Sequence, residues 1–305
     1  MPSNDHHSFS AVRKKRKNVT TKQKKTSQSS ASRTVSKPKP QKVKYMSNWF
    51  RNLLALVIVI CFSTAFYYWF VRPYAYRWKP CQGCKEYGVC IPSGFDVHGI
   101  DISHHQGDID WNRLSQNRNA AIPLYFVFMK ATEGGDHSDD RFVENFSAAR
   151  AHGFIRGAYH FYIPSTDAVK QADFFIQSVA LDSGDLPPVL DVEMIGEKEK
   201  KEFQRDVKRW LERVESHYGV KPILYTSYKF KERYLNDSAF NVYPYWIAHY
   251  YVDSVKYRGR WDFWQHTDVG TVPGIEKEVD LDVFNGTLDE LKELTINTKS
   301  SCEIE

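Results

Sequence analysis

The feature that most constrains the fold is a succession of eight short runs rich in β-branched and aromatic residues, separated by polar stretches. These runs occupy residues 97–103, 125–132, 155–163, 188–193, 222–227, 243–250, 261–267 and 279–284. Three intervening stretches, 139–152, 167–180 and 199–218, place apolar residues at helical spacing. Strands that alternate with helices form parallel β–α–β units. After the sixth run the gaps shrink to about ten residues, too short for a full crossover helix.

Eight such strands within residues 97–284 predict an α/β fold, a small closed (β/α) barrel of eight strands with a reduced set of helices. A doubly wound open sheet is the alternative. In its nucleotide-binding forms, such a sheet carries a glycine-rich phosphate loop. The sequence contains neither G-x-G-x-x-G nor G-x-x-x-x-G-K-[ST], so the barrel is favoured.

Charge is distributed very unevenly along the chain. The net charge is +5, yet residues 1–51 hold 14 lysines and arginines against a single acid, Asp5. The first 48 residues lack the apolar content of a folded core, so 1–48 is predicted to be a disordered, basic, cytoplasmic tail. Such a tail could bind nucleic acid, but very few aromatic residues interleave with its charges. A topology signal is the favoured role, and no nucleic-acid partner is expected.

Residues 49–71 are predicted to form a transmembrane helix. No charge lies between Asn52 and Val71, and 20 helical residues at about 1.5 Å each span a bilayer core. Trp49 and the aromatic run 67–69 mark the two ends, as in interfacial belts. The preceding basic residues predict a single-pass protein with a cytoplasmic N-terminus and a periplasmic or otherwise extracytoplasmic domain. A cleaved signal peptide is the alternative, but its exit requires small residues, and the exit here reads AFYYWFV.

The cysteines outside the predicted span are even in number, namely Cys81, Cys84, Cys90 and Cys302. In an oxidising compartment this predicts disulfides, with the pairing left open. CQGCKEYGVC could instead belong to a zinc knuckle, but the chain offers no second C-x-x-C. Residues 72–96, with three cysteines and three prolines, are predicted to be a linker, and Cys302 could tie the domain's end to it.

Three of the predicted strands carry acids on one face. Because strand side chains alternate, Asp191 and Glu193 of PVLDVE share the face opposite their aliphatic neighbours, and Asp101 and Asp280 do the same in their strands. In an α/β barrel this second face points inward, and the carboxyl-terminal strand ends form the active-site mouth. The four acids are therefore predicted to converge. Crowded carboxylates repel, so at least one should hold a proton near neutral pH, as glycosidic bond cleavage requires.

Each of these features has a structural alternative. Acids at strand ends also cap helices or pair with lysine and arginine, although repetition on three strands favours a site. The rings of Trp246, Tyr250 and Trp264 lie on or near strand ends, where they could stack on sugars or simply pack in the core. Several histidines lie near strand ends, yet no H-E-x-x-H spacing occurs, and neither a metal nor another cofactor is expected.

Taken in order, eight motifs resemble those of the glycoside hydrolase family 25 lysozymes: GIDISHHQGDIDW, FMKATEG, GAYHFY, PVLDVE, PILYTS, YWIAHY, WQHT and VDLDVFNG. The resemblance covers about 98–292, within a predicted catalytic barrel at 97–292 that leaves 293–305 as a C-terminal tail. It implies a flattened barrel of eight strands with fewer than eight helices. It also implies cleavage of the β-1,4 bond between N-acetylmuramic acid and N-acetylglucosamine in peptidoglycan.

The resemblance also implies roles for the four acids. Glu193 would be the general acid and base, and Asp191 would orient the substrate's 2-acetamido group for attack on the anomeric carbon. Direct attack by a carboxylate stays open as the alternative. Asp101 and Asp280 would tune protonation and bind substrate. Asp280 matches the Asp of the family's VDLN stretch, and in this chain Asp282 stands where that stretch usually has Asn.

Five aromatic residues are expected to bind the sugars, namely Tyr159, Tyr225, Trp246, Tyr250 and Trp264. The sequence therefore predicts a membrane-anchored N-acetylmuramidase whose partners are peptidoglycan glycan strands and, through one helix, the lipid bilayer. Protein partners and oligomeric state stay open. Two rivals are a hydrolase of another N-acetylhexosamine polymer such as chitin, and an inactive barrel that only binds glycan.

Overall fold

The computed structural model describes residues 45–72, 81 and 84–297. The predicted tail 1–48 therefore lies almost entirely outside the described residues, as do part of the predicted linker and Cys302.

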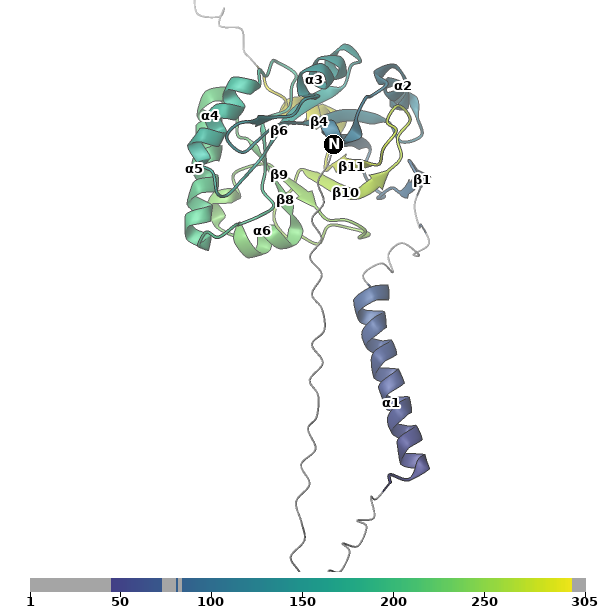
Figure 1. Ribbon diagram of the computed structural model, residues 1–305. Helices are drawn as coiled ribbons and strands as arrows, with labels where there is room; N and C mark the ends of the chain where they lie inside the picture. Colours follow the sequence, from purple (N-terminus) through teal and green to yellow (C-terminus); the bar gives the residue numbers. More distant parts are fainter. Residues whose placement is uncertain (1–44, 73–80, 82–83, 298–305) are drawn as a thin grey trace, which may run out of the picture. The chain divides into compact units, whose positions relative to one another are not determined.

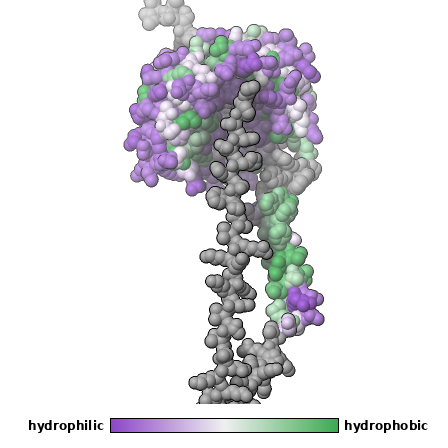
Figure 2. Space-filling view, viewed as in Figure 1, coloured by the Kyte–Doolittle hydropathy of each residue, from purple (hydrophilic) through white to green (hydrophobic). Residues whose placement is uncertain are grey.

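The apolar segment forms helix α1 (Asn48–Phe66), which a π-helix (Tyr67–Val71) continues. Together they form a helix of 24 residues that is long and apolar enough to cross a membrane. Figure 2 shows its hydrophobic residues gathered along the helix, and none of the residues from Asn48 to Val71 is buried. By length and composition, this helix matches the predicted span 49–71.

Eight strands close into a barrel. They are β3 (Val97–Ile102), β4 (Leu124–Glu133), β6 (Ile155–Phe161), β7 (Val189–Asp191), β8 (Ile223–Ser227), β9 (Tyr245–Ala248), β10 (Phe263–Gly270) and β11 (Val279–Phe284). Their order is β3-β11-β10-β9-β8-β7-β6-β4, and β4 pairs back to β3, while the short β5 (His137–Ser138) extends β4. All eight predicted strands are confirmed, with boundaries within three residues.

The direction of the last strand differs from the prediction. The other seven strands run parallel to one another, but β11 runs antiparallel to both β10 and β3, so the barrel is mixed and does not consist of the predicted parallel β–α–β units alone. The cause lies in the connection, because only residues 271–278 join β10 to β11. A segment this short can turn back at the same end of the barrel but cannot cross to the other end.

Few helices surround the barrel, and Figure 1 shows α3 to α6 on its outside. The helices are α2 (Trp111–Gln116), α3 (Phe142–Ala151), α4 (Ala168–Ser178), α5 (Lys200–Tyr218), α6 (Tyr228–Tyr234) and α7 (Leu288–Leu294), with 3-10 turns at His104–Gln106, Asn117–Asn119 and Ser238–Phe240. The three predicted helices are confirmed as α3, α4 and α5. The side chain of Asp167 caps the start of α4, and Gly219, at a φ of 71°, ends α5.

Before the barrel, β1 (Lys85–Glu86) and β2 (Val89–Cys90) form a small hairpin. A disulfide joins Cys81 to Cys90, which confirms the disulfide prediction for these two residues. It also takes two of the three thiolates that the zinc alternative required. Cys84 is exposed and has no disulfide partner among the described residues.

Two apolar layers follow from the alternation of side chains along the strands. The outer layer, between strands and helices, includes Ile100, Ile102, Leu190, Val192 and Leu281. The inner layer, inside the barrel, includes Phe126, Phe128, Trp246, Phe263 and Phe284. The predicted aliphatic outer faces are thus confirmed, and the inner face is left for aromatic rings and acids.

Aromatic rings fill the barrel beneath the acids. The ring of Phe128 stacks on Trp246, with centroids 4.3 Å apart. Two glycines make room: a Cβ atom on Gly99 would lie 2.4 Å from the ring of Phe126, and one on Gly157 would lie 2.5 Å from Phe128. The rings therefore pack directly against backbone, and they form an apolar floor for the polar groups at the mouth.

Candidate active site

A pocket of about 160 Å³ opens at the carboxyl-terminal ends of the parallel strands. Its lining residues are Asp101, Tyr159, Asp191, Glu193, Tyr225, Trp246, Tyr250, Gln265 and Asp280. The structure thus brings together all four acids and four of the five aromatic residues that the sequence singled out.

Strand topology explains how the acids meet. Asp101 lies next to the end of β3, Asp191 is the last residue of β7, and Glu193 follows two residues later. Asp280 is the second residue of β11, and it pairs in register with Asp101. Because β11 is antiparallel, its beginning lies at the mouth. A parallel strand would have carried Asp280 to the opposite end of the barrel.

The four acids differ in their access to solvent. Asp101 and Asp191 are only 6% and 7% exposed, Asp280 is half-buried, and Glu193 is exposed. The two buried carboxyls form the base of the pocket, whereas the Glu193 side chain stands where a bound sugar chain could reach it.

Burial raises the pKa of every acid in the pocket, and repulsion between carboxyls adds to it for Asp101, Asp191 and Asp280. Desolvation is the largest cause in each case, and neighbouring carboxyls add to it: Asp282 for Asp101, and Glu193 for Asp191. For Asp280, desolvation and then the charge of Asp101 raise the pKa to about 9. The pKa values therefore favour protonated carboxyls in the pocket near neutral pH.

The pKa of Glu193 is also raised. Desolvation in the half-enclosed pocket raises its pKa, while the Tyr225 hydroxyl, 3.4 Å from Oε1, and the charge of Lys130 act in the opposite direction. Lys130 also lowers the pKa of Asp191, and its ammonium lies 2.6 Å from the Glu133 carboxylate. Lys130 was not among the predicted site residues, although its place in FMKATEG, two residues after the inward-facing Phe128, puts it on the inner face of β4.

Gln265 connects the aromatic wall to the acids. Its amide donates to Asp101 Oδ2 at 2.6 Å, and its carbonyl accepts from the hydroxyls of Tyr225 and Tyr250 at 2.7 and 2.6 Å. Sequence reasoning missed this residue because it considered acids and rings. Its position in WQHT, two residues after the inward-facing Phe263, was the available signal.

Trp264 does not reach the pocket. Its side chain is fully buried, its indole N–H donates to the His249 carbonyl at 2.8 Å, and its ring packs edge-on against Phe95. The reason is again the alternation of side chains, since Phe263 and Gln265 face the barrel interior and the residue between them faces outward.

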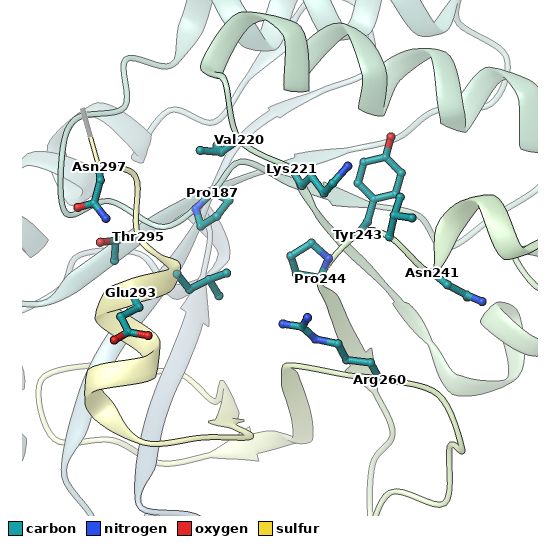
Figure 3. A pocket seen from close by; sticks show the side chains of 12 residues that line it. Pro187, Val220, Lys221, Asn241, Tyr243, Pro244, Arg260, Glu293, Thr295 and Asn297 are labelled. Atoms are coloured by element: carbon teal, nitrogen blue, oxygen red, sulfur yellow. The ribbon is translucent and has the colours of Figure 1, made fainter. Parts of the chain in front are cut away.

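Two further observations concern metal-binding groups and a second cavity. Among residues 45–72, 81 and 84–297, no three His, Cys, Asp or Glu side chains are grouped to hold a metal ion. A larger cavity of about 430 Å³ lies near the amino-terminal ends of β7 to β10 (Figure 3). Within the described part of the chain, Glu293 is the only acid that lines this cavity.

An eight-stranded barrel with four carboxyls and several aromatic rings at its mouth has the equipment of a glycoside hydrolase. Comparison with known proteins identifies the family. The sequence profile described as "Glycosyl hydrolases family 25" matches residues 100–275, more than half of the chain. The chain therefore belongs to glycosyl hydrolase family 25.

Individual relatives agree with this assignment. The Escherichia coli protein named "Uncharacterized protein YegX" is 44% identical over 218 residues, covering 71% of this chain and 79% of that protein. "Lysozyme M1" of Streptomyces globisporus is 32% identical over 218 residues, covering 66% and 72%. The crystal structure of a bacterial lysozyme from Streptomyces coelicolor superposes with a TM-score of 0.61 at 32% identity, covering 66% of this chain and 98% of that one.

Proposed function

We propose that this chain is a membrane-anchored lysozyme that cleaves the β-1,4 bond between N-acetylmuramic acid and N-acetylglucosamine. The observation that carries the proposal is the convergence of Asp101, Asp191, Glu193 and Asp280 on one pocket lined by aromatic residues. The lysozymes of the two Streptomyces species, which share the family or the fold, support the choice of peptidoglycan as substrate.

Glu193 is the general acid in this proposal. It is the exposed member of the acid set, and its raised pKa favours the protonated form that can donate to the leaving oxygen. After bond cleavage, the resulting carboxylate can take a proton from the attacking water. General acid catalysis of this kind contributes about 10²–10⁴ in rate.

Asp191 orients the substrate's 2-acetamido group. Its Oδ1 is buried and has no hydrogen-bond partner within the described residues, so it is free to accept the acetamido N–H. That hydrogen bond stabilises the ionised carboxylate against the burial and the Glu193 charge that raise its pKa. The acetamido carbonyl oxygen can then attack the anomeric carbon. Direct attack by Asp191 itself is the competing route.

The remaining pocket residues bind and orient the sugars. Asp101 and Asp280 offer carboxyl groups to sugar hydroxyls, and Tyr159, Tyr225 and Tyr250 add hydroxyls and ring faces. Gln265 fixes the two tyrosine hydroxyls and the Asp101 carboxyl in one network, so the pocket is organised before substrate enters.

We further propose that the chain crosses the bilayer once, with its N-terminus in the cytoplasm. The basic residues before α1 support this orientation through the positive-inside rule. The disulfide between Cys81 and Cys90 supports an oxidising compartment for the barrel. Anchoring keeps the enzyme beside the cell wall.

The test is the release of reducing sugar by the full chain, purified in detergent, from peptidoglycan and from chitin. Release from peptidoglycan, lost in Glu193→Gln, is the expected result. Faster release from chitin than from peptidoglycan would identify chitin, and not peptidoglycan, as the substrate. Binding to peptidoglycan without release, in wild type as in the variant, would leave a glycan-binding barrel instead of an enzyme.

A further inference from the structure

Beneath the pocket lies one buried acid that the proposed mechanism does not use. Asp282 is 0% exposed and faces the barrel interior from β11. Its Oδ1 accepts the indole N–H of Trp246 at 2.8 Å, whereas its Oδ2 is buried and accepts no hydrogen bond from an amide, hydroxyl or ring N–H of the described residues. The neighbouring strand β3 carries another carboxyl, that of Asp101, two residues along from Gly99, which pairs in register with Asp282. Each of the two carboxyls shifts the pKa of the other.

Two facing carboxylates cannot bond to each other, because an ionised carboxylate only accepts hydrogen bonds. A hydrogen bond between them requires a proton on one, and two buried like charges at this separation repel strongly. We propose that Asp101 and Asp282 share one proton, and that Asp282 is a positioning residue which holds the Asp101 carboxyl in place from below. The positioning role rests on the proposed function, whereas the shared proton does not.

Among the residues that the structure describes, the groups that most affect the pKa of the two carboxyls carry no positive charge. The groups around it are Asp280 on β11, Gln265 on β10, Trp246 on β9, Tyr225 on β8, Tyr250 after β9, Asp191 and Glu193 at the end of β7, Tyr159 on β6 and Lys130 on β4. Those named as causes of the two raised pKa values are acidic or neutral, whereas Lys130 lowers the pKa of Asp191 and Glu193.

The shared proton fixes Asp101 from two sides. Gln265 donates to Oδ2 from the pocket side, and Asp282 bonds from the interior, where Trp246 anchors it in turn. Asparagine provides a matched control at position 282. Its carbonyl can accept from Trp246 and its NH₂ can donate to Asp101 without any titratable proton.

The first test measures, without substrate, whether the folded protein holds one more proton than the unfolded chain at this pair. Urea unfolding of the full chain in detergent is measured from about pH 5.5 to 8 for wild type and Asp282→Asn. An unfolded aspartate, with a pKa near 3.9, is ionised throughout this range, so a folded wild type that keeps the proton loses stability as pH rises. The unfolding constant of wild type relative to Asp282→Asn should then rise about tenfold per pH unit. A ratio independent of pH overturns the shared proton.

The second test concerns positioning. Asp282→Leu removes both hydrogen bonds at similar volume, and it should lower kcat on peptidoglycan about tenfold or more with KM changed less than about threefold. Asp282→Asn should restore most of that turnover. Equal loss in both variants, or no loss in Asp282→Leu, overturns the positioning role. If wild type is inactive on peptidoglycan, the proposed function and the positioning role both fail, while the proton count still decides whether the pair shares a proton.

Discussion

Replacement of Glu193 by glutamine tests the proposed general acid. The side chain is exposed, and the hydrogen bond that it accepts from Tyr225 is long at 3.4 Å, so Glu193→Gln should change the free energy of unfolding by less than about 0.5 kcal/mol. Turnover should fall by about 10²–10⁴, because glutamine cannot donate a proton to the leaving oxygen. At about 1.36 kcal/mol per tenfold, the barrier rises by about 2.7–5.4 kcal/mol.

The assay is the initial rate of reducing-sugar release from purified peptidoglycan, with urea unfolding of the same preparations as the check on folding. Glu197→Gln is the matched control, since Glu197 is exposed on the same loop and lies outside the pocket lining. Its turnover should equal that of wild type. Near-normal turnover in a folded Glu193→Gln variant would refute the reasoning.

Three further predictions concern two acids of the pocket and the aromatic packing beneath them. Asp191→Asn should lower kcat about 10²-fold or more by the acetamido route, and activity kinetics on peptidoglycan at matched enzyme concentration will show whether it does. Since Asp280 has its pKa raised to about 9, its contribution to stability is complete below about pH 4 and is lost as pH rises toward 9. Urea unfolding of Asp280→Asn should accordingly show a slope shallower by up to about 1.4 kcal/mol per pH unit between pH 5 and 8. Gly157→Ala should destabilise the barrel by about 1–3 kcal/mol in the same assay, because its Cβ would lie 2.5 Å from the Phe128 ring.

The alternation of side chains made much of the fold predictable. It placed the aliphatic residues of β3, β7 and β11 in the outer layer and their acids on the inner face. Applied to β10, the same alternation would have excluded Trp264 and selected Gln265, because both follow from the inward position of Phe263. Residue type alone favours Trp264, but the face of the strand decides which side chain enters the pocket.

The direction of a strand is harder to predict from the sequence. A run of residues such as VDLDVF looks the same whether the strand points up or down, and only the short connection at 271–278 indicates reversal. The proton shared by Asp101 and Asp282 was also hidden, because it depends on which of several inward acids lie within reach of each other across strands. Such a distance is set by register and twist, which a single sequence does not state.

The most direct test of the proposed function is mass spectrometry of the fragments that the full chain releases from purified peptidoglycan, after reduction of their new ends. Every new reducing end should be N-acetylmuramic acid, and Glu193→Gln should release no fragments. Fragments that end in N-acetylglucosamine would show cleavage of the other glycosidic bond. Glycan strands that stay intact after prolonged incubation with folded protein would show that the four carboxyls at the mouth do not form a hydrolase.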